Sequence, residues 1–195
     1  MKFDEIFLRK LATNQVVGES HPFDSGKISL VVKYIKGLVG RLGDNSSILV
    51  EPDFTYYGSG FASYIPTKIS KRSGSDTKVE SSKGEITRTT KGILLYISNL
   101  GPYWYYGGGT WSVTTENGRF SSSSGGFLFP EDHNKYDASI WATDIEKIKS
   151  SMEDAGYQLL TRKELEAPLD FDLRLSSNLV FGKPRVFDCF FHWDD

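Results

Sequence analysis

The most reactive side chains in this sequence are those of one cysteine and three histidines. Their spacing along the chain does not predict a catalytic site. Cys189 and His192 lie three residues apart in a segment predicted as a strand, so they would point to opposite faces of a sheet. Asp188 and His192 would share a face but stand about 13 Å apart, too far for a catalytic hydrogen bond. His21 precedes a proline, and His133 lies in a polar loop without a histidine partner at helical spacing. We therefore predict structural or solvent-facing roles for these residues, and neither a catalytic residue nor a metal site.

Two aspartates form a second candidate group near the C-terminal end of the chain. Asp170 and Asp172 alternate with apolar residues, so they would project from one face of an edge strand. Paired carboxylates could serve a hydrolase, or a surface that meets a basic protein. A solvated edge protected by charge explains them more simply. We retain both aspartates as candidate partner-binding residues.

An aromatic cluster is the most suggestive feature, and it consists of Tyr103, Trp104, Tyr105, Tyr106 and Trp111. A proline and three consecutive glycines interrupt it, which indicates an irregular loop. Exposed loop aromatics could anchor a protein interface or stack on sugars and bases. The alternative is that these rings are core residues that cap one end of the sheet. The glycines lack the lysine and the helix start of a phosphate-binding loop, so no cofactor is predicted.

Composition limits the class of protein. A chain of 195 residues predicts a single domain over residues 1–195. The net charge of −2 gives no reason to expect nucleic acid or an anionic membrane as a partner. One cysteine excludes a disulfide framework, and acids near the N-terminus argue against a secretory signal. No apolar run approaches the roughly 20 residues that span a bilayer, so we predict a cytoplasmic protein.

Three helices are predicted. Asp4 can cap a helix to about Asn14, and apolar residues at helical spacing predict a helix over 28–42 that stops at Gly43. The β-branched residues in the second segment leave a strand pair as an alternative. Thr143 is a suitable N-cap for a helix over 144–155.

The rest of the chain predicts strands and turns. An Asn-Gly pair at 117–118 indicates a hairpin, and the composition of 121–126 predicts a Ser/Gly loop. The polar segment 70–84 is expected to form a mobile loop or a long hairpin tip. Capping-box spacing at Thr161 predicts a short helical turn. The predicted strands are a short strand over 46–51 that ends before Pro52, then 54–64, 85–90, 91–98, 110–115, 157–160 and 185–193. The fold class is therefore α+β, a mostly antiparallel sheet with two to three helices packed on one face.

Three stretches together resemble a known group of proteins. They are LLYISNLGPYWYYGGG (94–109), DAGYQLLTRKELEAPL (154–169) and VFDCFFHWDD (186–195), about a third of the chain. They are similar to immunity proteins of bacterial polymorphic toxin systems. The resemblance implies a cytoplasmic protein without enzymatic activity that neutralises a toxin by tight binding. Many such proteins are strongly acidic, and the near-neutral charge here departs from that pattern.

Three hypotheses follow from the sequence. The first is an immunity-type inhibitor that occludes the active site of a toxin domain, with the aromatic cluster as anchor and nearby acids setting the orientation. The second is a carbohydrate- or small-ligand-binding module that uses the same aromatic side chains. The third is a hydrolase assembled from scattered acids and histidines.

Overall fold

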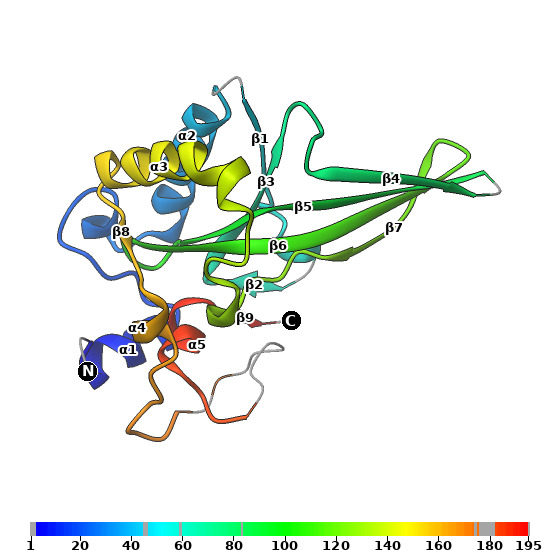
Figure 1. The fold of residues 1–195 in the computed structure, drawn as a ribbon. Coiled ribbons are helices and arrows are strands. Elements are labelled where there is room, and N and C mark those ends of the chain that lie inside the picture. Colours follow the sequence, from blue (N-terminus) through cyan, green and yellow to red (C-terminus); the bar gives the residue numbers. More distant parts are fainter. Residues whose placement is uncertain are drawn as a thin grey trace.

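The computed structural model describes residues 3–44, 47–58, 60–82, 84–173, 175 and 182–194. Within these ranges the chain is a mixture of helices and mostly antiparallel strands, which confirms the α+β prediction (Figure 1). The α-helices are α1 (Glu5–Ala12), α2 (Ile28–Gly43), α3 (Ala138–Asp154), α4 (Arg162–Leu165) and α5 (Val186–Phe190). None of the described helices has both the length and the apolar character needed to cross a membrane.

One large sheet organises the described residues. Its strands are β1 (Ile48–Pro52), β3 (Tyr64–Lys71), β4 (Thr77–Ser82), β5 (Glu85–Ser98), β6 (Tyr103–Glu116), β7 (Arg119–Gly125) and β8 (Gln158–Leu159). The order is β1-β3-β5-β6-β7, with β4 on the far half of β5 and β8 parallel to the start of β6. A separate pair joins β2 (Phe61–Ala62) to β9 (Trp193–Asp194). Strands β5 and β6 are paired along almost their whole length and belong to every part of this sheet.

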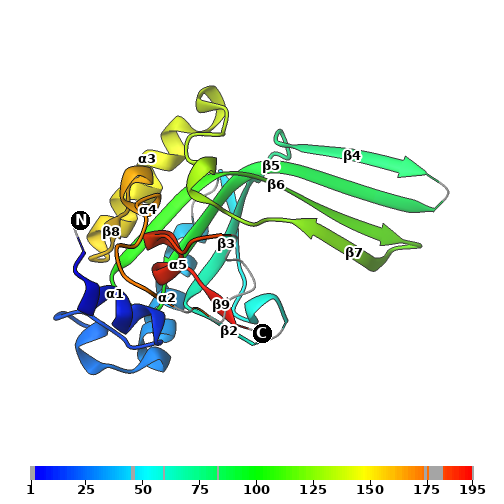
Figure 2. The ribbon, with the colours of Figure 1, turned by 90° about the horizontal axis from the view of Figure 1, so that it is seen from below.

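The two faces of the sheet carry different layers. Helices α2 and α3 cover one face, as predicted, and pack on side chains such as Ile93, Leu95 and Trp104. The shorter helices α1, α4 and α5 lie on the other side, where Leu94 and Tyr105 contribute to a second apolar cluster (Figure 2). Neighbouring strand residues point to opposite faces, so the continuous apolar run in β5 reflects burial on both sides.

The first two helices match the prediction, whereas α3 begins earlier. Asp4 caps α1 by accepting a hydrogen bond from the Phe7 amide. Helix α3 starts at Ala138 rather than after Thr143, because the Asp137 carboxylate accepts a bond from the Ser139 amide at 2.9 Å. The predicted end of α3 is confirmed, since Ala155 is its C-cap.

Two segments expected as loops contain strands. Strand β4 occupies Thr77–Ser82 within the polar segment 70–84, of which Lys83 lies outside the described residues. The expected Ser/Gly loop over 121–126 is mostly strand β7, which pairs with β6 across the predicted Asn-Gly turn. Serine-rich strands lack an apolar period, so their pairing is decided by the neighbouring strand rather than by their own sequence.

The C-terminal segment is a helix followed by a short strand, and the prediction of a single strand over 185–193 is wrong. The Asp188 carboxylate accepts a bond from the Arg185 amide at 2.7 Å and so caps α5. All five residues of α5 are buried, and all of them except Asp188 belong to the second apolar cluster. The aromatic alternation that suggested a strand is thus compatible with one helical turn buried on all sides.

Gly107 and Gly108 allow a connecting segment, here called the strap (residues 126–137), to cross the edge of β6 between β7 and β8. A Cβ on Gly107 would lie 2.6 Å from the Asp132 carbonyl oxygen, and a Cβ on Gly108 would lie 1.9 Å from that of Lys135. Successive strand residues face opposite sides, so the strap contacts both faces of the sheet at this point. Only glycine permits so close an approach of two backbones.

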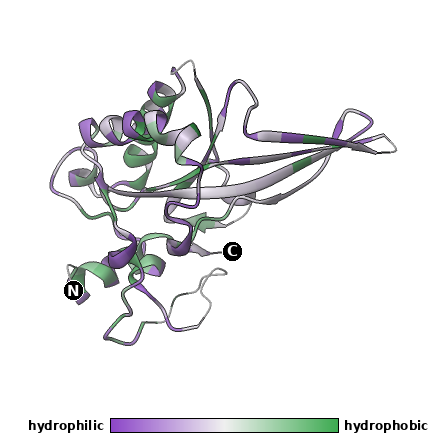
Figure 3. Cartoon of the chain, viewed as in Figure 1, coloured by the Kyte–Doolittle hydropathy of each residue, from purple (hydrophilic) through white to green (hydrophobic). Residues whose placement is uncertain are grey.

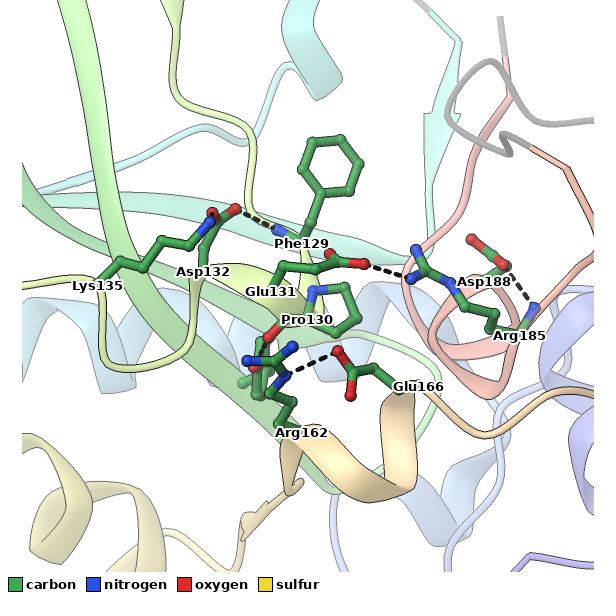
Figure 4. Close-up of polar contacts among 10 residues, drawn as sticks. Phe129, Pro130, Glu131, Asp132, Lys135, Arg162, Glu166, Arg185 and Asp188 are labelled. Carbon is green, nitrogen blue, oxygen red and sulfur yellow. Dashed lines mark hydrogen bonds and ion pairs between the residues drawn. The ribbon is translucent and has the colours of Figure 1, made fainter.

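Polar contacts hold the strap in this position (Figure 4). The Tyr105 hydroxyl donates to the Pro130 carbonyl at 2.8 Å, and the Arg185 guanidinium pairs with the Glu131 carboxylate at 2.7 Å. The Asp132 carboxylate accepts from the Phe129 amide at 2.9 Å and pairs with Lys135 at 3.0 Å. The strap therefore packs against β6 between its two neighbouring strands and is held there by side-chain contacts.

We predict that Gly108→Ala destabilises the protein by about 2–3 kcal/mol, because the new methyl group overlaps the Lys135 carbonyl. Gly40→Ala is the matched control, since Gly40 is exposed in α2 and a Cβ there meets no atom within 4 Å. The control should stabilise the protein by about 0.5–1 kcal/mol. Urea unfolding followed by circular dichroism measures both. Equal effects of the two substitutions would show that the strap is not fixed by this contact.

A buried ion pair ties α3 to the sheet. The Lys71 ammonium contacts the Asp144 carboxylate, and their side chains are only 11% and 6% exposed. The Ser47 hydroxyl donates to the same carboxylate at 2.6 Å. Burial alone would raise the pKa of Asp144, but the hydrogen bonds from Lys71 and Ser47 hold that pKa below its ordinary value. The pair thus stabilises the fold above the unfolded-state pKa of about 4, and this contribution is lost as pH falls through the native pKa.

Asp144→Asn should cost about 3–5 kcal/mol at neutral pH, because it leaves a buried lysine without its counter-charge. The variant should also lose less stability than the wild type between about pH 5 and pH 3. Asp170→Asn at an exposed position is the control and should change stability by less than about 0.5 kcal/mol. Urea unfolding across this pH range provides the measurement. Parallel pH profiles for the wild type and Asp144→Asn would contradict the assignment.

Candidate binding surface

The aromatic cluster singled out in the sequence lies inside the protein. Trp104, Tyr105, Tyr106 and Trp111 are at most 5% exposed, and all four belong to strand β6. Tyr103 is half-buried and its ring packs edge-on against Phe190 with centroids 5.1 Å apart. The expectation of an exposed aromatic loop is therefore wrong. The glycines that suggested a loop are strand residues; Gly107 and Gly108 make room for the strap, and Gly109 makes room for the Leu94 side chain.

The two candidate aspartates are exposed but do not form an edge strand. Asp170 and Asp172 lie in the irregular segment after α4. The Arg9 guanidinium donates to the Asp172 carbonyl at 3.0 Å and lies 4.6 Å from the centroid of the Phe171 ring. This places the aspartates beside α1, outside the core strand that holds the aromatic cluster. The structure does not bring the two predicted groups together.

The titratable residues near the C-terminus have structural surroundings, as predicted. Burial raises the pKa of the Cys189 thiol to about 12, which keeps it protonated. Burial lowers the pKa of His192, whose Nε2 lies 2.7 Å from the Asn14 side-chain oxygen. Among the described residues no group of three or more His, Cys, Asp or Glu side chains could hold a metal ion.

The most distinctive exposed feature is a wing that projects from the body of the protein (Figure 1). It consists of β4, the far half of β5 (85–90), the far half of β6 (111–116) and β7, in that spatial order. Every residue of β7 is exposed, and so is nearly all of β4. The strongly hydrophobic segments gather in the body, whereas the wing is mostly hydrophilic to neutral (Figure 3). The wing therefore adds little to the core of the protein.

One face of the wing carries an apolar row that crosses all four strands. The strand registers place Val79, Ile86, Val113 and Phe120 diagonally next to one another on this face. Val79 is 57% exposed and Phe120 is 69% exposed, while the other two are half-buried. Arg88 lies between Val79 and Val113 on the same face and is exposed. An apolar row on a projecting element is a typical feature of a protein-binding surface.

The opposite face of the wing is built from hydroxyl side chains. The Thr87 and Thr114 hydroxyls are 2.9 Å apart, and those of Thr89 and Ser112 are 2.8 Å apart. These cross-strand pairs stabilise the strands without an apolar layer. The two faces of the wing thus differ in chemistry, and only one offers apolar contact.

The two edges of the wing carry features that oppose edge-to-edge pairing. An ion pair between Lys78 and Glu80 at 2.6 Å places charges along β4. A register shift between Thr114 and Thr115 marks a bulge where β7 pairs with β6. Charges and bulges are two ways in which sheets avoid uncontrolled pairing. The apolar face, rather than an edge, is therefore the better candidate for recognition.

A groove of about 670 Å³, here called the base groove, adjoins the apolar row where the wing joins the body. Val113 belongs to both. Its other lining residues include the aromatic side chains Tyr57, Trp111 and Phe127 and the charged side chains of Asp53 and Lys68. Deeper in, the Tyr57 hydroxyl lies 3.2 Å from that of Tyr64 and 3.3 Å from that of Tyr96. Burial raises the pKa of all three tyrosines, so they stay neutral and act as hydrogen-bonding groups rather than bases.

Sequence reasoning missed the wing and the base groove. The available signal was the isolated apolar residues in otherwise hydroxyl-rich segments, of which Val79 and Phe120 are the clearest examples. An exposed apolar residue in a polar strand fits neither a core strand nor a solvated one.

If the apolar row serves recognition and not folding, Phe120→Ser should change the free energy of unfolding by less than about 0.5 kcal/mol. Trp104→Ala should lower the free energy of unfolding by about 3–5 kcal/mol, because its buried indole belongs to the apolar cluster between the sheet and helices α2 and α3. Chemical denaturation of both variants tests this contrast. A large loss of stability for Phe120→Ser would assign the row to the fold.

The chain was also compared with known proteins. No family model matches the sequence, and no curated protein and no solved structure matches it either.

Proposed function

We propose that this chain is a non-enzymatic binding protein, specifically an immunity-type inhibitor that neutralises a toxin domain by covering its active site. The observation that carries the proposal is the apolar row on the projecting wing. Phe120 is 69% and Val79 57% exposed there, whereas Trp104, Tyr105 and Tyr106 in the body are buried. A contiguous row of exposed apolar side chains, unlike a single exposed residue such as Ile6, marks a surface for contact with another molecule.

The shape of the wing supports occlusion of a concave site. Four paired strands extend from the body, and β5 and β6 continue into its core (Figures 1 and 2). Because β5 and β6 anchor the wing in the body, the wing is already ordered, and little conformational entropy is lost when it enters a cleft. An inserted aromatic side chain surrounded by smaller contacts is the usual arrangement of a binding hot spot.

Charge supports the same mode of binding. Arg88 lies within the apolar row. On this face the neighbouring strands β4 and β6 place hydroxyl side chains, and no acidic side chains, near it. A guanidinium at the centre of an apolar surface complements a carboxylate in the partner's cleft, and such complementarity fixes orientation. The proposal further places the protein in the cytoplasm, as the sequence resemblance implies.

The test is affinity capture of the partner from a lysate of the source cells with the full chain as bait. The wild type and Ile6→Ser should capture the same single protein, because Ile6 is an equally exposed residue on α1, away from the wing. The double variant with Val79→Ser and Phe120→Ser should bind that protein at least about 100-fold more weakly, equivalent to about 2.7 kcal/mol.

The captured domain must also be toxic when produced alone and harmless when produced with the wild-type chain. The wing double variant should fail to protect, while Ile6→Ser protects. Capture of no protein would contradict the proposal, as would equal protection by the wing double variant.

A further inference from the structure

The base groove has the composition of a ligand site distinct from the apolar row. Tyr57 and Phe127 form one wall, with ring centroids 5.3 Å apart. Phe127 is 38% exposed, so part of its ring is available to a ligand. A volume of about 670 Å³ is in the range of small-molecule sites, which span roughly 300–1,000 Å³.

The polar groups of the groove include both donors and acceptors. Lys68 lies over the Trp111 ring, 5.9 Å from its centroid, and offers ammonium donors. Glu51 stands opposite Lys68 on the neighbouring strand and lines the groove with Asp53. Glu51 faces Lys68 across the strand pair, and both Asp53 carboxylate oxygens accept backbone amide hydrogen bonds, so the charges of the groove already have partners within the protein. A neutral ligand that donates and accepts hydrogen bonds fits this mixture.

The wall of the groove is preorganised. Tyr56 and Tyr57 have φ angles of 53° and 58°, in the left-handed region that bulky residues rarely adopt. The Asp53 carboxylate holds this turn by accepting bonds from the Thr55 amide at 2.7 Å and the Tyr57 amide at 3.0 Å. The Tyr57 hydroxyl is fixed by Tyr64 and Tyr96 at its other end. Backbone strain that the surroundings maintain in this way is concentrated at functional sites.

Glycine keeps the groove open on the strap side. Gly126 has a φ of 85°, and a Cβ there would lie 2.7 Å from Lys68 Cε. A side chain at this position would displace the lysine from the groove. The lysine, the aromatic wall and the turn are thus positioned together.

We propose that the base groove binds the ring of a neutral saccharide. The apolar C–H face of a sugar ring would stack on Phe127 and Tyr57, while its hydroxyls would accept from Lys68 and donate to the carboxylates. This site shares only Val113 with the apolar row, so its other side chains and Phe120 can be altered independently.

Binding of the full chain is tested by isothermal titration with maltose, cellobiose, lactose and chitobiose as probes. At least one probe should saturate, and Phe127→Ser and Lys68→Met should each weaken its binding at least tenfold. Phe120→Ser and Lys78→Met are the matched controls, since both residues are exposed and neither lines this groove, and they should bind as the wild type does.

Circular dichroism confirms that each variant is folded, and Tyr57→Phe provides a conservative second change that removes only a hydroxyl. Absence of saturable binding to all four probes would overturn the proposal, as would unchanged affinity in both groove variants. These outcomes leave the inhibitor proposal untouched, because that proposal depends on Phe120 and Val79 and is read by protein capture.

Discussion

The structure depends on the close passage of the strap across β6. The strap contacts both faces of the sheet at Gly107 and Gly108, and it is then fixed by Tyr105, Glu131 and Asp132. It covers the middle of β6, where no strand of the described chain pairs on that side. The strap also connects β7 of the wing to helix α3. Without glycine at the crossing, β6 would have an open edge and α3 would lose its path to the sheet.

A second consequence concerns how two long strands serve two environments. In the body, β5 and β6 are buried on both faces, and their side chains fill two separate apolar clusters. In the wing the same strands are mostly half-buried, and their pairing is supported by hydroxyl contacts such as Thr87 with Thr114. The hydrogen-bonded ladder is continuous through both parts. The body therefore supplies the stability that an isolated, solvent-exposed sheet lacks.

The sequence predicts those elements whose signals are local. Asp4, the Asn117-Gly118 turn and the capping box at Thr161 each act within a few residues, and each is found where expected. The α+β class and the helices α1 and α2 follow from periodicity.

The aromatic run in β6 could not be placed correctly from the sequence. Two of its glycines, Gly107 and Gly108, are required by close contact with the strap, which lies some 25 residues further along the chain. The C-terminal helix α5 was not predicted, because it is buried on all sides and its sequence therefore lacks the helical alternation of apolar and polar residues. The candidate site was missed for a related reason: the apolar row is continuous only across strands, through a register that no single segment contains.

The division between body and wing has a consequence for how recognition can change during evolution. A substitution of a buried residue in the body disturbs one of two packed clusters and lowers the stability of the fold. A substitution at an exposed wing position such as Phe120 leaves those clusters intact. Variation can therefore accumulate at the proposed binding surface while the scaffold is kept. If the wing binds a partner as proposed, such an arrangement allows one fold to follow a partner that itself diverges, one side chain at a time.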